Sequence, residues 1–157
     1  MNVPSVFKAG VILGAGMGGF LDGIVLHQIL GWHHLICRTE TCQPTSIAML
    51  QQQAAEDGWF HLAVWVVTLA GIGLLHRARR DPRGGRTLAG GMLAGFGLFN
   101  FVEGLVDHQI LGIHHVRPES PNPLLWDLAF LASGVVLLTI GWMLREKAQG
   151  RARATQP

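Results

Sequence analysis

Four apolar stretches dominate the pattern of hydrophobic and polar positions along the chain. They cover residues 9–30, 59–75, 87–111 and 124–144. A bilayer core of about 30 Å needs about 20 apolar residues in a helix, and about 17 still suffice. The stretches show no strict alternation of apolar and polar positions, so strands of a membrane barrel are not expected. The pattern predicts an all-α integral membrane protein, a bundle of four helices.

The lysine and arginine residues are distributed unevenly between the links that join these stretches. Ten of the twelve lie before the first stretch, between the second and third, or after the fourth, and only Arg38 and Arg117 lie in the other two links. Basic residues accumulate in cytoplasmic loops. We therefore expect a multi-pass membrane protein with both termini in the cytoplasm. The lipid bilayer is the expected partner, and nucleic acid is not.

The domain organisation follows from the length and from the first stretch. For 157 residues we expect one domain, residues 1–147, followed by a disordered cytoplasmic tail at 148–157. The first stretch has one basic residue before it, Lys8, and no clear small-residue cleavage site in front of a mature domain. We therefore expect this stretch to be a membrane helix rather than a removed signal peptide.

The chain repeats itself at an offset of 81 residues. Residues 19–34 read GFLDGIVLHQILGWHH and residues 100–115 read NFVEGLVDHQILGIHH, with ten of sixteen positions identical. The repeat halves are residues 9–76 and 87–147, each a helical hairpin that starts from the cytoplasm. Such halves are related by a pseudo-twofold axis along the membrane normal. Glycines at spacing four, such as Gly10 with Gly14, predict a close approach of the first and third helices.

Histidines and carboxylates gather at the predicted outer ends of the helices. Ionisable groups at membrane depth are costly unless paired, and they mark function by default. Imidazole and carboxylate together suit transition metals. A polar network that only fixes helix pairing is the alternative. The expected metal site draws on His27, His33, His34, His61, His108, His114, His115, Asp22, Glu103 and Asp127.

Helix geometry limits how these residues can meet. Asp22 and His27 lie about 140° apart on a regular α-helix, so both can face one metal only across a π-bulge or a helix end. Gly31 and Gly112 are expected to end their helices. We expect His27 and His108 as direct ligands, with one histidine of each His-His pair, His61 and the Asp22/Glu103 pair completing one or two sites. The glutamines after the two ligands are expected to support them by hydrogen bonds.

The second helices align less closely than the first. WFHLA at 59–63 resembles LWDLA at 125–129, which sets His61 opposite Asp127. In the outer loop CRTETC, which has no counterpart in the repeat, we expect a disulfide between Cys37 and Cys42. Capture of copper by these two soft ligands is the alternative.

The composition excludes several other classes of protein. Charged residues make up 14% of the chain, against about 25% in an ordinary soluble domain, and there are two cysteines. A disordered chain, a highly charged nucleic-acid binder and a disulfide-dense scaffold are therefore excluded. Serines are few and none has the context of a catalytic triad, and the HExxH motif of zinc hydrolases is absent.

The two HQILGxHH segments, each with a carboxylate five residues before the first histidine, resemble a family of bacterial predicted membrane proteins, domain of unknown function family 2243. The resemblance covers about residues 9–145. It implies four membrane helices, a location in the bacterial inner (cytoplasmic) membrane and no particular activity. The histidine spacing is only distantly similar to the histidine boxes of membrane desaturases and hydroxylases, which use HxxxH and HxxHH.

Two functions from different classes fit these features. The first is a transition-metal-binding membrane protein that holds one or two ions, copper or non-haem iron ahead of zinc, for metal handling or delivery to an envelope metalloprotein. The second is a small membrane metallo-oxidoreductase whose dinuclear non-haem site acts on O2 or on a small or lipophilic substrate. Haem between His27 and His108 is a lesser variant, and a proton pathway through Asp22 and Glu103 is a further alternative. The oligomeric state is open, and a homodimer is compatible with the sequence.

Overall fold

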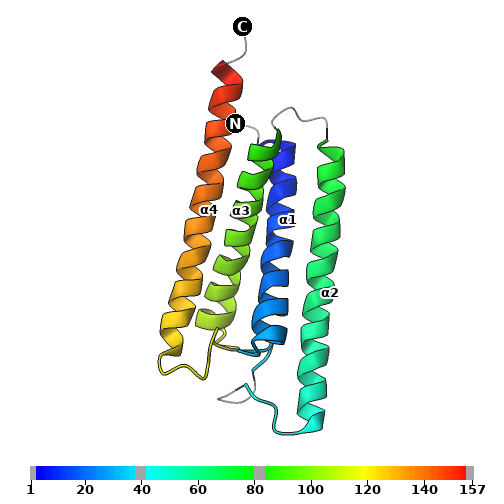
Figure 1. The fold of residues 1–157 in the computed structure, drawn as a ribbon, viewed down its shortest axis with the longest axis vertical. Helices are drawn as coiled ribbons and strands as arrows, with labels where there is room; N and C mark the ends of the chain where they lie inside the picture. Colours follow the sequence, from blue (N-terminus) through cyan, green and yellow to red (C-terminus); the bar gives the residue numbers. More distant parts are fainter. Residues whose placement is uncertain (1–2, 38–41, 80–83, 155–157) are drawn as a thin grey trace.

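The computed structural model describes residues 3–37, 42–79 and 84–154, and in it long helices lie side by side (Figure 1). Helix α1 (Ser5–Leu21) continues as the π-helix η1 (Asp22–Ile29), and α3 (Gly84–Glu103) continues as the π-helix η2 (Gly104–Ile110). The other two helices are α2 (Ile47–Arg77) and α4 (Pro123–Ala154). Within these described ranges there is no strand, so the predicted all-α class is confirmed.

Four helices are long and apolar enough to cross a membrane, as the hydrophobic pattern predicts. The candidate spans are Ser5–Ile29, Ile47–Arg77, Gly84–Ile110 and Pro123–Glu146. Helix α2 differs most from its apolar stretch, because it begins at Ile47 rather than near residue 59. Its start is capped by Ser46, whose Oγ accepts a hydrogen bond from the Met49 backbone N–H at 3.1 Å. The early start adds about three turns, and it places Asp57, which belongs to the site described below, on a helix.

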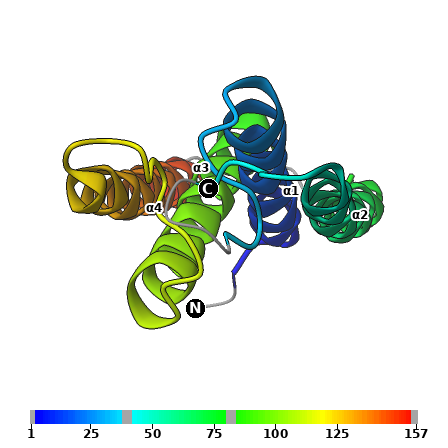
Figure 2. The same ribbon diagram turned by 90° about the horizontal axis from the view of Figure 1, so that it is seen from below.

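The helices are arranged around a central pair formed by α1 and α3. Helix α2 packs on α1 and helix α4 packs on α3, so that the two outer helices lie on opposite sides of the pair (Figure 2). In the apolar windows of α1 and α3, 44% of the residues are buried, against 11% in α2 and 17% in α4. The arrangement is therefore more open than a square bundle, and the outer helices present most of their apolar surface outward.

Glycines allow α1 and α3 to pack closely, as their spacing predicts. A Cβ atom on Gly14 would overlap the backbone carbonyl of Met92, and one on Gly95 would overlap the carbonyl of Val11. Residues 14 and 95, and likewise 11 and 92, are equivalent at the offset of 81, so each helix makes the same contact on the other. Small residues at such crossings let helix backbones approach within van der Waals contact.

Gly14→Ala and Gly95→Ala are each expected to lower the thermal midpoint of the protein in detergent, because the added methyl group overlaps a carbonyl on the facing helix. Such overpacking costs about 1–3 kcal/mol. Circular dichroism during heating measures the midpoint. Gly73→Ala is the matched control, since a Cβ at Gly73 meets no atom within 4 Å. Equal midpoints for Gly14→Ala and Gly73→Ala would contradict the close crossing.

The two ends of the molecule differ in their chemistry. The end that carries His27, His108 and the loops after them is called the histidine end here. The opposite end, where α1 and α3 start and α2 ends (Figure 1), is the arginine end, and there Arg79 Nη1 lies 2.6 Å from His76 Nε2. Helix α4 also ends on this side, and it continues to Ala154 where the sequence predicts disorder from residue 148. Alanine, glutamine and arginine, which make up this segment apart from Gly150, are good helix formers; residues 155–157 lie outside the described ranges.

A disulfide joins Cys37 and Cys42 at the histidine end, with their Cα atoms 5.0 Å apart. This is the pairing that the sequence favours over a copper-binding pair. Cys42 has a φ of 57°, which is uncommon for a residue with a side chain. The disulfide ties the segment after His34 to the segment before α2, while residues 38–41 between the cysteines lie outside the described ranges.

Candidate metal centre

The π-helices bring together residues that an α-helix would hold apart. The backbone N–H groups of Leu30 and Leu111 bond to the carbonyls of Val25 and Val106, each at 2.8 Å, with the five-residue spacing of a π-helix. Residues five apart then lie nearly in line along the axis. As a result Asp22 Oδ2 lies 2.9 Å from His27 Nε2. This confirms the prediction that Asp22 and His27 need a π-bulge to face one another.

Two glycines end the π-helices and turn the chain back over the helix ends. Gly31 and Gly112 have φ of 57° and 56°, in the left-handed region that favours glycine. The next residues, Trp32 and Ile113, close each turn by bonding back to the carbonyls of Leu26 and Asp107 at 2.9 and 2.8 Å. The predicted helix stops are therefore confirmed.

The turns place His33 and His114 between the two halves of the molecule. His33 Nδ1 donates to the carbonyl of Val116 at 2.8 Å, and His114 Nδ1 donates to the carbonyl of Leu35 at 3.1 Å. Each histidine thus binds the backbone of the other half, at equivalent positions of the repeat. The two imidazole rings stack with their centroids 4.5 Å apart.

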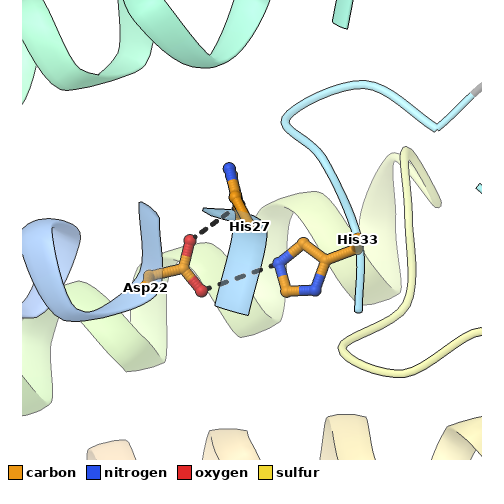
Figure 3. Close-up of side chains that lie close together, drawn as sticks. All are labelled: Asp22, His27 and His33. Carbon is orange, nitrogen blue, oxygen red and sulfur yellow. Dashed lines mark ion pairs between the residues drawn. The ribbon is translucent and has the colours of Figure 1, made fainter. Parts of the chain in front are cut away.

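Two groups of donor atoms at this point have the spacing of a metal site. In the first group the ligand atoms of Asp22, His27 and His33 all lie within 4.8 Å of one another. Asp22 points its two carboxylate oxygens toward the two histidines (Figure 3), with Oδ1 3.6 Å from His33 Nε2. The second group, which meets the same limit, consists of His33, Glu103 and His114. Because His33 belongs to both groups, they form one continuous cluster, and all of its members are buried.

Several buried atoms of this cluster have no hydrogen-bond partner outside it. They are both carboxylate oxygens of Asp22, Nε2 of His27, Nε2 of His33 and Oε2 of Glu103. Within the cluster, Asp22 Oδ2 and His27 Nε2 face each other at 2.9 Å, which requires a proton or a cation between them. Leaving a buried polar atom unsatisfied costs about 1–3 kcal/mol, so these atoms need a shared proton or a bound ion.

The hydrogen bonds of the cluster fix which histidine nitrogens are free to bind a metal. A backbone carbonyl only accepts hydrogen bonds, so Nδ1 carries the proton in His33 and His114. An ionised carboxylate does the same for His27, whose Nδ1 lies 3.0 Å from Asp57 Oδ1. In the neutral side chains the lone pair is therefore on Nε2. His114 Nε2 faces His108 Nε2 at 3.1 Å, so these two nitrogens share one proton or donate both lone pairs to a cation.

His114 lies in the link between the spans, and its environment keeps it neutral. Burial, together with the nearby imidazoles of His33 and His108, lowers the pKa of His114 from 6.5 to about 2. A histidine binds metal only in its neutral form. His114 therefore offers a metal ligand throughout the physiological pH range.

A buried carboxylate lies behind the first half of the cluster, on α2. Asp57 Oδ1 accepts hydrogen bonds from His27 Nδ1 at 3.0 Å and from the Leu35 backbone N–H at 2.9 Å. Its Oδ2 accepts from His34 Nδ1 at 2.7 Å and from Gln28 Nε2 at 2.9 Å. A carboxylate on the far nitrogen of a metal-binding histidine orients the ring and makes it more basic. Asp57 has the position for this role toward His27, and Gln28 supports it as predicted.

Asp127 on α4 makes the corresponding contacts in the second half. Its Oδ2 accepts from His115 Nδ1 at 2.6 Å, and its Oδ1 accepts from the Val116 backbone N–H at 2.9 Å. The same Oδ1 lies 3.8 Å from His108 Nδ1, which is longer than a hydrogen bond. A small movement of the His108 ring would complete the match with Asp57 and His27.

The structure places the predicted site residues in three layers. The central cluster contains Asp22, His27, His33, Glu103, His108 and His114. One contact further out lie His34, His115 and Asp127. His61 lies apart from the cluster: its Nδ1 donates to the backbone carbonyl of Asp57 at 2.8 Å, and its ring lies against Phe20 and Phe60.

Asp57 is the residue that the sequence analysis missed, and it replaces His61 as the counterpart of Asp127. Two aromatic contacts identify the matching register: Phe60 packs on His27 at 5.5 Å and Phe130 on His108 at 5.4 Å between ring centroids. Asp57 and Asp127 each lie three residues before these phenylalanines. The pattern Asp-x-x-Phe, which recurs at an offset of 70, was the available signal.

The comparisons with known proteins identify the family of the chain but no metal and no reaction. A family model described as "Predicted membrane protein" matches residues 9–148, a range that contains every residue of the cluster and its supporting carboxylates. No curated protein and no solved structure matches the chain. The chain belongs to the predicted membrane protein family DUF2243.

Proposed function

We propose that this protein binds one or two transition-metal ions at the histidine end, through Asp22, His27, His33, Glu103, His108 and His114. The observation that carries the proposal is the convergence of buried donor atoms of Asp22, His27, His33 and Glu103, which have no hydrogen-bond partners outside the cluster. Mixed imidazole and carboxylate ligands suit iron, copper, zinc or manganese. Copper or non-haem iron is proposed ahead of zinc. The physiological role that we favour is metal handling, including delivery to an envelope metalloprotein.

The way in which the two halves share their ligands allows either one ion or two. Asp22 with His27, and Glu103 with His108, are equivalent pairs of the repeat, and His33 and His114 contact both halves. Two adjacent ions with two to three protein ligands each, or one ion held between the halves, use this donor set. Haem fits less well, because the rings of His33 and His114 contact those of both His27 and His108 and fill the space between them.

The two hairpins are proposed to be related by a pseudo-twofold axis along the membrane normal. Supporting this are the paired contacts that recur at the repeat offset, such as His33 with Val116 and His114 with Leu35. Ten of the twelve basic residues precede the first apolar stretch, lie between the second and third, or follow the fourth, so the proposed topology has both termini in the cytoplasm and the metal site outside. Alkaline phosphatase fused after residue 157 is expected to be inactive; an active fusion would reverse the orientation.

The experiment that tests the proposed function is reconstitution of the detergent-purified protein with iron, copper and zinc in turn. After dialysis, elemental analysis is expected to find one or two ions of a preferred metal per chain. A polar network of protonated histidines and carboxylates predicts no retained metal. Less than a tenth of an ion per chain with all three metals would reject the proposal.

A second candidate function is a small metallo-oxidoreductase, and one observation favours it. A cavity of about 220 Å³ lies beside the cluster and is lined in part by Glu103. A purely structural or storage site has no need of such a cavity, whereas a catalytic metal keeps an open position for a substrate. A redox-active metal with an exchangeable ligand would support this function, and a preference for zinc with a saturated ligand set would oppose it.

A further inference from the structure

The cavity beside the cluster continues along the membrane-spanning part of the molecule. A second hollow of about 250 Å³ adjoins it, and the two share Ala15, Phe60 and Phe99 in their walls. The walls come from α1, α2 and α3, so the two hollows form a groove along α1 between α2 and α3. All of the lining residues lie within the candidate membrane spans. In a bilayer the groove therefore opens toward lipid rather than toward water.

The groove is apolar except at the end that lies nearest the metal cluster. There it is lined by two carboxylates, Glu103 and Asp107. Glu103 is 8% exposed, and its Oε2 has no hydrogen-bond partner. A carboxylate that ends an apolar groove needs a hydrogen-bond donor or a cation there. Because Glu103 belongs to the cluster and Asp107 does not, the groove has an acceptor that is independent of the metal ligands.

Two residues that line the groove differ from their counterparts in the other half of the repeat. At the offset of 81, Ala15 in the groove wall corresponds to Phe96, and Asp107 corresponds to Leu26. Phe96 and Leu26 are apolar residues of ordinary helix packing, and Leu26 is buried. Helix packing therefore accommodates a large side chain at the position of Ala15 and an apolar side chain at the position of Asp107. The α2–α3 side instead has the small residue that widens the groove and the carboxylate that makes its end polar.

We propose that this groove, which we call the α2–α3 groove, binds a lipophilic molecule that carries a hydroxyl group and enters sideways from the bilayer. The apolar body lies against the wall formed by Ala15, Phe60 and Phe99, and the hydroxyl donates a hydrogen bond to Asp107 or Glu103. Ligand sites commonly combine an apolar wall with a few convergent polar groups in this way. The role of the bound molecule as a substrate rests on the proposed metal site, because the groove places the molecule beside the metal.

The size of the groove selects a suitable probe. The hollow at the carboxylate end has about 220 Å³, which is enough for a molecule of two fused aromatic rings. 2-Naphthol carries a hydroxyl on such a ring system, and its methyl ether, 2-methoxynaphthalene, has the same rings without a donor. Equilibrium dialysis against the protein in lipid nanodiscs measures the binding of both, with empty nanodiscs correcting for partition into lipid.

Two variants taken from the repeat test the site. Ala15→Phe introduces the residue of the equivalent position and is expected to weaken 2-naphthol binding by tenfold or more. Asp107→Leu, also the equivalent residue, is expected to remove the preference for 2-naphthol over its methyl ether, which in the wild type should be tenfold or more. Ala70→Phe makes the same size change on the exposed face of α2, outside the groove walls, and should have no effect.

Metal content measured on the same samples separates this inference from the proposed function. Ala15→Phe and Asp107→Leu are expected to retain the wild-type metal content, since neither residue belongs to the cluster. Equal binding of the two probes by the wild type, or unchanged binding in Ala15→Phe, would overturn the groove proposal whatever the metal content. Selective binding that responds to both variants would support the groove even in a protein that holds no metal, and only its role as a substrate site would then fail.

Discussion

The double variant His33→Ala/His114→Ala is expected to lose its bound metal, with an affinity reduced by more than about 100-fold. His33 belongs to both groups of donor atoms and His114 to one of them, so the change removes ligands from each half at once. It also removes the hydrogen bonds to Val116 and Leu35 that join the halves. Elemental analysis after reconstitution, beside the wild type, measures the loss.

His76→Ala is the matched control for this double variant. His76 lies at the arginine end, where its contact is with Arg79, and it is remote from the cluster. It should retain the full metal content. Circular dichroism and gel filtration of both proteins show whether the helices and the monodisperse state survive. A folded double variant that still holds one or two ions per chain would show that the metal lies elsewhere.

Asp57→Asn is expected to weaken metal binding by about 10- to 100-fold, although Asp57 is not itself a proposed ligand. The carboxylate accepts hydrogen bonds from His27 and His34 on different oxygens. An asparagine side chain has one oxygen and one NH2 group, so it cannot accept from both histidines. The variant also loses the negative charge that makes the His27 ring a stronger ligand. A competition titration with a chromophoric chelator measures the change.

His61→Ala provides the comparison that distinguishes the observed register from the one expected from sequence. His61 bonds only to the backbone carbonyl of Asp57 among the described hydrogen bonds, and it is no part of the donor groups. Its removal should change the metal affinity by less than threefold. A larger effect in His61→Ala than in Asp57→Asn would mean that the second helices are correctly aligned by WFHLA and LWDLA after all.

The helices and their crossing were predictable because their causes are local and repeated. The length of each apolar stretch predicts a membrane helix. Because the chain repeats at an offset of 81 residues, the contact of Gly14 on α3 recurs as the contact of Gly95 on α1. A π-bulge or a helix end between Asp22 and His27 was expected, because these two residues would point apart on an α-helix. The open arrangement, with α2 and α4 on opposite sides, was not predicted. In a sequence, apolar residues that face lipid cannot be distinguished from apolar residues that face another helix.

The inner part of the site was predicted better than its support. A histidine or carboxylate inside an apolar stretch stands out, so Asp22, His27, Glu103 and His108 were found directly. Asp57 was missed because it lies in the polar segment before the second apolar stretch, which has the composition of a loop but is the first part of α2. The roles of His34 and His115 depend on Asp57 and Asp127, and adjacent histidines in a sequence do not reveal which one turns inward.

The measurement that most directly tests the metal site is X-ray absorption spectroscopy of the purified, reconstituted protein at the edge of the metal that it retains. Ligation by the histidines and carboxylates of the cluster predicts nitrogen and oxygen neighbours at about 2.0–2.2 Å, the range found for zinc, together with the outer-shell scattering of imidazole rings. Sulfur at about 2.3 Å would place the metal on reduced Cys37 and Cys42 instead. That result, or a spectrum without imidazole scattering, would contradict a metal site built from the two histidine-rich turns.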